Sequence, residues 1–258
     1  MTDELTPLET RQEIERQFHD HKSKKRPRAD PHNFYEAGGL DEVWRAYLVR
    51  IGALRGKTIL DFGCGDGWAA TEYARRGGLV HSFDISFESL KKVKAKLAGG
   101  GRHGRVHPAV MAAEHLGYRT GSFDLVLGIG ILHHTDLSMV SGEVSRVLRP
   151  GGRALFMEPL AHNPFLRAFR TLTPGRRTPT ERPMTVQQMR EFVRGFEWAE
   201  FRGYQLVSII PQGLLWATGN RAIFRMSLRL SEAMDHWLLP KWPALHRYCW
   251  SAIIEVRK

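Results

Sequence analysis

"ILDFGCGDGW", residues 59–68, is the stretch that decides the fold of this chain. A short apolar run leads directly into Gly63, Gly65 and Gly67, as expected where a buried strand ends in a tight turn. In open parallel sheets, ligands bind at the carboxyl ends of the strands. Glycines there let the backbone approach a ligand, and the following helix offers free N–H groups. We therefore predict a ligand-binding turn between a strand and a helix.

The residues that follow alternate between strand-like and helix-like segments. Ser86 stands where the N-cap of the second helix is expected. Glycine and proline at Pro150-Gly151-Gly152 are expected to stop a later helix. The expected helices are "WAATEYARRGG", "SFESLKKVKAKLAGGG" and "SMVSGEVSRVLRPGG", and the expected strands are "LVHSFD", "SFDLVLGIGIL" and "ALFMEP". This alternation predicts an α/β fold with a parallel, doubly wound sheet.

The two ends of the chain differ from this regular core. Residues 1–38 contain a polar helix to about residue 20 and the basic run "HKSKKRPRAD", and we expect them to form a cap. Residues 39–160 form the core. Residues 161–258 contain a lid-like connection rich in Pro, Arg and Thr, a helix, a late amphipathic insert and closing strands. We expect all three parts to belong to one domain.

Composition limits the class of protein. The two cysteines, Cys64 and Cys249, are far apart in the sequence, which excludes a disulfide scaffold or a cysteine-rich zinc site. Neither a secretory signal nor an apolar run of about 20 residues is visible, so we expect a cytoplasmic protein. The formal net charge of +11 indicates an anionic partner, or only a surface with more Arg than Glu.

The turn itself indicates its ligand. Asp84, at the end of the second strand, can accept hydrogen bonds from both hydroxyls of a ribose, so the ligand should contain a nucleoside. A dinucleotide turn normally reads Gly-x-Gly-x-x-Gly, but here Trp68 occupies the position of the third glycine. Asp61, two residues before the first glycine, suits a cationic amino-acid group better than a pyrophosphate. These features disfavour NAD and favour S-adenosylmethionine (SAM).

At this point the chain resembles a known family. "ILDFGCGDG", "FDIS", "GSFDLVLGIGILHH" and "VSRVLRPGGRALFMEP" look like the successive motifs of class I SAM-dependent methyltransferases. They are most similar to the ubiquinone/menaquinone-biosynthesis-type and small-molecule methyltransferases, over roughly residues 40 to 160. The resemblance implies a Rossmann-like, mostly parallel seven-stranded sheet with a helical cap and inserts. It also implies methyl transfer from SAM, with S-adenosyl-L-homocysteine as the product.

The resemblance further implies which residues hold the cofactor. Ala112 stands where the family often has an acid that contacts the adenine amino group, so a backbone group would replace that contact. Tyr35 is expected to fold over the SAM carboxylate. The other implied residues are Asp61, Gly63, Cys64 and Gly65 at the methionine end, Asp84 at the ribose, Ile85 and Met111 near the adenine, and Gly128 beside the methionine portion.

Catalytic residues are less determined by the sequence. Methyl transfer is an in-line displacement, so positioning matters most, and a general base is needed only if the acceptor must lose a proton. Glu158, His133 and His134 are the candidates, with His162 as a weaker one. Alternatively, the histidines cap the next helix and Glu158 is only a strand-end carboxylate. No metal-ligand spacing is visible.

The acceptor is predicted to be a small hydrophobic or amphipathic molecule with an anionic group, methylated on oxygen, nitrogen or carbon. The lid and the late insert combine arginines with aromatic residues, which suits an amphipathic helix at an anionic membrane or lipid surface. It also suits a homodimer contact. An RNA methyltransferase is an alternative, but nucleic acid is disfavoured because no RNA-binding module is visible. A SAM-binding protein that does not methylate is a second alternative.

Overall fold

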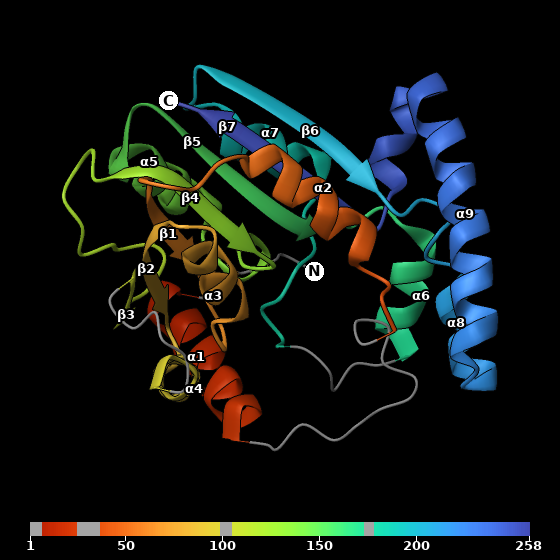
Figure 1. Ribbon diagram of the computed structural model, residues 1–258, viewed down its shortest axis with the longest axis horizontal. Helices are drawn as coiled ribbons and strands as arrows, with labels where there is room; N and C mark the ends of the chain where they lie inside the picture. Colours follow the sequence, from red (N-terminus) through yellow and green to blue (C-terminus); the bar gives the residue numbers. More distant parts are fainter. Residues whose placement is uncertain (1–6, 25–36, 99–104, 173–177) are drawn as a thin grey trace.

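The structure is a computed structural model, and it describes residues 7–24, 37–98, 105–172 and 178–258. Its centre is a sheet of seven strands (Figure 1). The strands are β1 (Thr58–Phe62), β2 (Leu79–Asp84), β3 (Val106–Val110), β4 (Phe123–Ile129), β5 (Leu148–Pro159), β6 (Trp198–Tyr204) and β7 (Ser251–Arg257). They lie in the order β3-β2-β1-β4-β5-β7-β6, and only the pairings that involve β7 are antiparallel. The predicted doubly wound, mostly parallel seven-stranded sheet is confirmed.

Helices cover both faces of this sheet. The described helices are α1 (Leu8–Lys24), α2 (Asp41–Ile51), α3 (Trp68–Arg75), α4 (Phe87–Ala98), α5 (Leu137–Val147), α6 (Pro164–Leu172), α7 (Val186–Val193), α8 (Pro211–Thr218) and α9 (Arg221–Lys241), with 3-10 turns η2 (Leu132–His134) and η4 (Pro243–Tyr248). Those that cover the two faces are α5 and α7 on one side and α2, α3 and α4 on the other. Among these described helices, none has the length and apolar character needed to cross a membrane.

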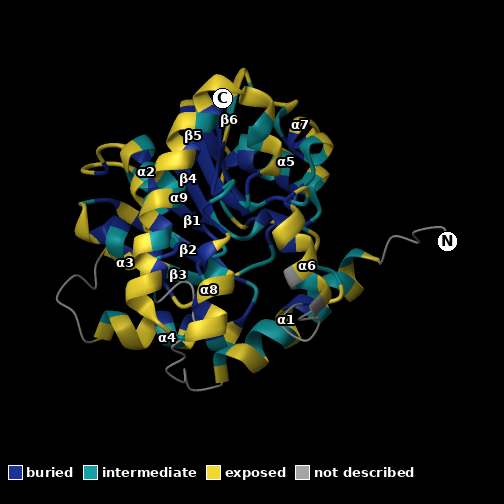
Figure 2. Ribbon diagram, turned by 90° about the vertical axis from the view of Figure 1, so that its right-hand side faces the viewer, coloured by how far each residue is buried: buried dark blue, intermediate teal, exposed yellow. Residues whose placement is uncertain are grey.

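The apolar strands divide the core into two clusters, one on each face of the sheet. Leu60 and Phe62 of β1 belong to the cluster that includes residues of α5 and α7, whereas Ile59 belongs to the cluster that includes residues of α2 and α3. All three side chains are fully buried. Figure 2 shows the same arrangement, with buried strands between helices whose outer faces are exposed. A strand that is buried on both faces reads as a continuous apolar run, which explains why β1 was visible in the sequence.

The helix predicted to run up to Pro150 ends earlier. α5 stops at Val147, and Leu148 already pairs with Phe123 as the first residue of β5. Pro150, Gly151 and Gly152 therefore lie inside the strand, next to a register shift. Proline disfavours helical geometry at the residue before it, which draws the chain into an extended conformation before the glycines are reached.

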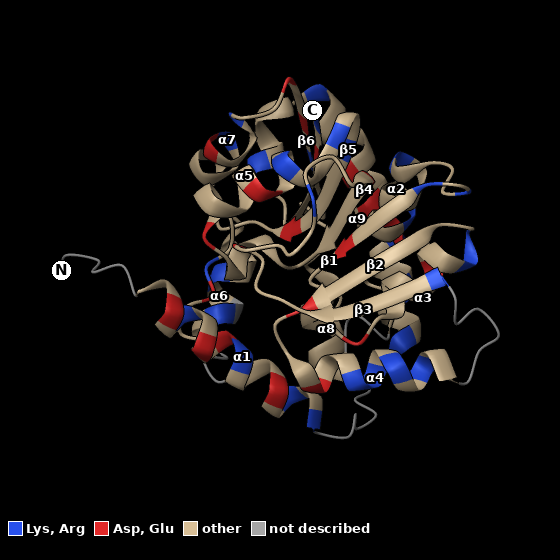
Figure 3. Ribbon diagram, turned by 90° about the vertical axis from the view of Figure 1, so that its left-hand side faces the viewer, with Lys and Arg blue, Asp and Glu red and all other residues tan. Residues whose placement is uncertain are grey.

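The first helix packs across the carboxyl edge of the sheet, beside α4 (Figure 3). Ser86 donates its hydroxyl to Asp20 Oδ1 at 2.6 Å, and the hydroxyls of Ser23 and Ser89 lie 2.9 Å apart. Ser86 also accepts the backbone N–H of Ser89, so its predicted N-cap role is confirmed. The polar leader is thus a docked helix, and it lies where the strands end.

Candidate functional site

A cavity of about 530 Å³ opens at the carboxyl ends of the parallel strands. The turn after β1, the end of β2, the segment after β3, the end of β4 and one side of α1 all contribute to its wall. Its lining includes Gly63, Gly65, Asp84, Ile85 and Met111. This volume is typical of a small-molecule or cofactor site. Segments far apart in the sequence are therefore brought together where an open α/β sheet binds its ligand.

The glycines of the turn have two different reasons to be glycine. Gly63 has φ +70°, and a Cβ there would lie 2.6 Å from Cγ1 of Ile131. Gly65 has φ +51°, but a Cβ there would meet nothing within 4 Å. Gly63 is therefore required by packing as well as by backbone conformation. Gly65 leaves bare backbone beside the cavity, which lets a ligand approach the main chain closely.

Asp84 is held rigidly at the edge of the cavity. Its Oδ2 accepts the N–H of Gly65 and its Oδ1 accepts the N–H of Ser86, each at 2.8 Å. Burial raises the pKa of Asp84, and these two backbone hydrogen bonds oppose the rise. A carboxylate has about four acceptor positions, so each oxygen can still accept from a ligand. A fixed acceptor next to bare backbone fits the sugar of a nucleoside-containing cofactor.

Of the three residues expected near the adenine, the structure places two in the cavity lining. Ile85 and Met111 line the cavity, but Ala112, between Met111 and Ala113, does not. Glu114, which sequence reasoning missed, is buried and lines the cavity. Its Oε2 accepts from the Gln12 amide at 2.9 Å and its Oε1 from the Asp136 N–H at 3.0 Å.

Three predicted residues lie behind the turn and do not line the cavity: Asp61, Cys64 and Gly128. Burial raises the pKa of Asp61 to about 7, against the lowering effect of a hydrogen bond from Ser82. Burial likewise raises the pKa of the Cys64 thiol. A Cβ on Gly128 would lie 2.6 Å from the ring of Phe156, so this glycine is required by packing.

Glu158 and His133 form a buried pair outside the cavity lining. Oε1 of Glu158 accepts the backbone N–H groups of Ile131 and Leu132, both at 2.9 Å. Its Oε2 lies 2.7 Å from Nδ1 of His133. Oε1 is thus fully occupied within the protein, and Oε2 faces His133 outside the cavity lining. The pair holds the loop between β4 and α5 in place, whereas the N-cap of α5 is Asp136 and not a histidine.

His134 does line the cavity, in contrast to His133. His162 is exposed and is not among the lining residues. Tyr35 lies outside the described residues. Of the sequence-predicted catalytic candidates, His134 is therefore the one that can reach a ligand in this cavity.

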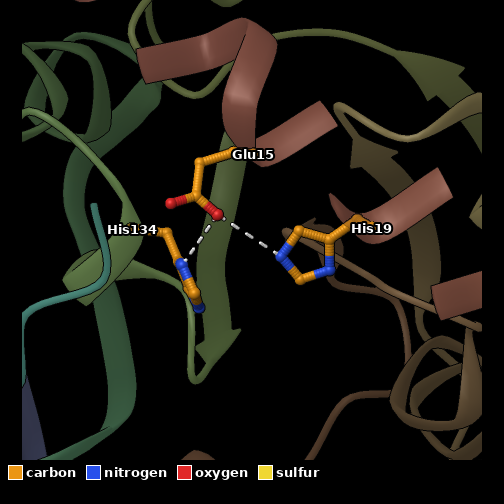
Figure 4. A group of neighbouring side chains, drawn as sticks. All are labelled: Glu15, His19 and His134. Atoms are coloured by element: carbon orange, nitrogen blue, oxygen red, sulfur yellow. Dashed lines mark ion pairs between the residues drawn. The ribbon is translucent and has the colours of Figure 1, made fainter. Parts of the chain in front are cut away.

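The structure places α1, which was expected to belong to a cap, in the wall of the cavity, and it adds Glu15 and His19, which sequence reasoning did not name. Glu15, only 4% exposed, places Oε2 at 3.0 Å from Nδ1 of His134 and 3.6 Å from Nε2 of His19 (Figure 4). Its Oε1 accepts the hydroxyls of Thr178 at 2.7 Å and Thr180 at 2.5 Å. Glu15 and His19 are four residues apart, a spacing that places both on one helix face and is a signal available in the sequence.

The electrostatics of this group keep its carboxylate charged and one imidazole neutral. Burial raises the pKa of Glu15, but His134, His19 and Thr180 together lower it well below its usual range. Burial lowers the pKa of His134, as does the neighbouring His133, and Glu15 only partly opposes this. The group thus combines an ionised carboxylate with a neutral imidazole at the cavity wall.

Comparison with known proteins agrees with this geometry. A family model described as "Methyltransferase domain" matches residues 60–156, which contain the glycine turn, Asp84 and the β4–α5 loop. The chain is 32% identical over 127 residues to the ubiquinone/menaquinone biosynthesis C-methyltransferase UbiE of Teredinibacter turnerae, covering 47% of this chain and 51% of that protein. It is 35% identical over 129 residues to the malonyl-[acyl-carrier protein] O-methyltransferase of Hamiltonella defensa, covering 48% and 47%. The chain thus spans about half the length of the curated relatives it matches.

Similarity of fold extends over nearly the whole chain. The geranyl diphosphate C-methyltransferase of Streptomyces coelicolor A3(2), solved with Mg²⁺, geranyl diphosphate and S-adenosyl-L-homocysteine, superposes with a TM-score of 0.62. The alignment covers 98% of each chain at 15% identity. At this identity the likeness concerns the fold, including the helices outside the matched domain.

Proposed function

Because residues 60–156 match the family described as "Methyltransferase domain", we propose that the chain is a class I SAM-dependent methyltransferase that transfers the methyl group of SAM to a small-molecule acceptor. The observation that carries the proposal is the cavity at the strand ends, where Gly65 offers bare backbone and Asp84 a fixed carboxylate. SAM supplies an electrophilic methyl group on a sulfonium. The protein must bind it, orient the acceptor and exclude water.

The cofactor residues follow from this placement. Asp84 accepts from the ribose hydroxyls, and the backbone of the turn from Gly63 to Gly65 holds the methionine end. Ile85 and Met111 flank the adenine, with backbone groups near Ala112 in place of the missing acid. This assignment is supported by the cavity itself, whose lining contains Gly63, Gly65, Asp84, Ile85 and Met111.

Catalysis then rests mainly on positioning. Glu158 and His133 fix the loop after β4, and His134 faces the cavity from that loop. If the acceptor must lose a proton, His134 is the group that can take it, since its lowered pKa leaves the imidazole neutral. Glu158 has no such part, because it is buried outside the cavity lining and its Oε2 faces His133.

The acceptor that fits best is small, amphipathic and anionic. Lys22 and Lys92 line the cavity and supply positive charge, while Ile129 and Ile131 supply apolar surface. This combination suits a carboxylate or phosphate attached to a hydrophobic body.

The late helix offers a route to such acceptors. Ile223, Met226, Leu230, Met234 and Trp237 follow each other at intervals of three or four residues along α9, and all are exposed. Arginines accompany this stripe on the same helix. We propose that α9 contacts an anionic lipid surface, as amphipathic helices do. Binding to vesicles that contain anionic lipid supports this, whereas dimerisation without vesicle binding assigns the stripe to a second copy.

The test of the proposed function uses methyl-labelled SAM and an extract of the source cells. Label in the organic or aqueous small-molecule fraction supports the proposal and separates a lipid-like acceptor from a polar one. Label in RNA would replace it with an RNA methyltransferase. SAM binding by calorimetry without any transfer would contradict the proposed reaction and favour a cofactor-binding protein that does not methylate.

A further inference from the structure

We propose that Glu15, His19 and His134 form a binding site for one divalent transition-metal ion, such as Zn²⁺, in the wall of the cavity. Glu15 and His19 come from one face of α1, and His134 comes from the loop after β4. All three line the same cavity. Methyl transfer from SAM as proposed above does not require this ion, so the inference goes beyond the proposed function. It can be tested separately, because metal binding can be measured without SAM and without an acceptor.

The distances suit a shared ion. Oε2 of Glu15 lies 3.0 Å from Nδ1 of His134 and 3.6 Å from Nε2 of His19, and one ligand atom from each residue lies within 4.8 Å of the others. An ion about 2.0–2.2 Å from each ligand, with angles of roughly 90° to 110°, requires ligand separations of roughly 2.9–3.5 Å. Small side-chain rotations therefore bring all three atoms onto one ion. Figure 4 shows the carboxylate oxygen directed between the two imidazoles.

Two of the three ligand atoms lack a hydrogen-bond partner. Among the residues that the structure describes, neither Oε2 of Glu15 nor Nδ1 of His134 is satisfied, although both atoms are buried. They lie 3.0 Å apart, so only a proton on Nδ1 or a shared cation can satisfy the pair. Leaving buried polar atoms unpaired costs about 1–3 kcal/mol each, and more for a charged group. A cation shared by these atoms removes that cost.

Neighbouring groups hold the ligands as supporting groups do in metal sites. Thr178 and Thr180 donate to the other oxygen of Glu15, which fixes the carboxylate. Arg11 donates to the backbone carbonyl of His134 at 3.0 Å. Such contacts orient metal ligands and strengthen binding.

The ligand types indicate the class of metal. Two imidazoles and one carboxylate suit Zn²⁺, Co²⁺ or Fe²⁺, whereas Mg²⁺ and Ca²⁺ prefer oxygen ligands. Three protein ligands leave at least one coordination position, which is available to water or to an anionic oxygen of a ligand in the cavity. A second group, His133, His134 and Glu181, shares His134. It is the weaker candidate, because His133 is paired with Glu158 and Glu181 with Arg170.

The experiment titrates the full chain, stripped of metal by a chelator, with Zn²⁺ in a calorimeter and with Co²⁺ in a visible spectrometer. We expect one saturable site, with Co²⁺ absorption bands typical of nitrogen and oxygen ligation, and no competition from excess Mg²⁺. Removing one ligand should weaken binding by at least the ~10–100-fold that loss of a supporting contact costs. Glu15→Gln and His19→Gln test this.

Matched controls separate the site from its surroundings. His21, two residues beyond His19 on the same helix, is exposed, so His21→Gln should bind Zn²⁺ like the parent chain. Glu181→Gln should also bind it normally. Absence of saturable Zn²⁺ or Co²⁺ binding by the parent chain overturns the inference, as does parent-like affinity in a folded Glu15→Gln chain. Loss of binding in Glu181→Gln with retention in Glu15→Gln would assign the ion to the other group. SAM binding is measured in parallel, so failure of the metal site and failure of the proposed function are distinguishable.

Discussion

Replacing Glu158 should change the stability of the protein much more than its chemistry. Glu158→Ala removes the acceptor of two backbone N–H groups, those of Ile131 and Leu132, and the partner of His133. An unsatisfied buried donor costs about 1–3 kcal/mol, so the two N–H groups together cost roughly 2–6 kcal/mol. A typical domain has about 5–15 kcal/mol of stability in total. The alanine variant should therefore lose a large fraction of it.

Glu158→Gln keeps the oxygen that accepts both N–H groups and changes only the atom that faces His133. That imidazole can accept from an amide by changing its tautomer, so we expect a cost below about 2 kcal/mol. For a chain of this size, about 2–4 °C of Tm accompanies each kcal/mol. The Tm should thus fall by roughly 4–24 °C for the alanine variant and by clearly less for the glutamine variant.

The measurements are thermal unfolding, SAM affinity by calorimetry and transfer of labelled methyl. An alanine variant that melts like the parent chain would refute the view that Glu158 clamps the loop. A glutamine variant that keeps its Tm and its SAM affinity but transfers no label would refute the second half of the reasoning. In that case Glu158 is a general base, and the loop must move to admit the acceptor to it.

The cofactor site gives three further predictions. Asp84→Asn should weaken SAM binding at least about tenfold in calorimetry, because a charged hydrogen bond contributes about 1.5–3 kcal/mol. Glu13→Gln, at an exposed ion pair with Arg16 outside the cavity lining, should change affinity little, and equal affinities of the two variants would contradict the placement of the ribose. Gly63→Ala and Gly65→Ala should both carry a strain of about 1–2 kcal/mol, but only the first adds a clash, with the partly buried Ile131. Gly63→Ala should therefore have the lower Tm, and the reverse order would contradict the packing argument. Burial raises the pKa of Asp61 from 3.8 to about 7, so the folded protein keeps this proton to a higher pH than the unfolded chain does. The free energy of unfolding should therefore fall by roughly 4 kcal/mol as the pH rises from about 4 to about 7. Asp61→Asn should flatten this part of the pH–stability curve, and an unchanged curve would show that Asp61 ionises normally.

The sheet could be predicted from the sequence because its signals are local. β1, β4 and β5 are buried on both faces, so they appear as apolar runs bounded by glycine or proline. The turn after β1 and the N-cap at Ser86 depend on neighbouring residues alone. Where local signals competed, prediction was less accurate. α5 ends at Val147 because pairing of Leu148 with β4 begins before the proline is reached.

The site was only partly predictable because half of it comes from long-range docking. Asp84 and Gly65 stand within two successive motifs, and their hydrogen bond follows from the order of β1 and β2. The meeting of Glu15 with His134 depends instead on how α1 lies across the strand ends, and a polar helix gives little indication of its docking face. That Glu158 faces the loop could not be seen in the sequence either, since a strand-end carboxylate looks the same whether it faces a ligand or a loop.

The docking of α1 links two parts of the site that the sequence presents as separate. On one side, Asp20 accepts from Ser86, which directly follows Ile85 of the cofactor cavity. On the other side, Glu15 accepts from Thr178 and Thr180, in the segment between β5 and α7. One helix thus contacts the cavity wall both beside Ile85 and at the segment between β5 and α7. Since the carboxylate that joins the second side also faces two imidazoles, an ion bound there would tighten the closure of the cavity around its ligand. Metal and SAM should therefore bind with positive coupling, because each favours the docked position of the same helix.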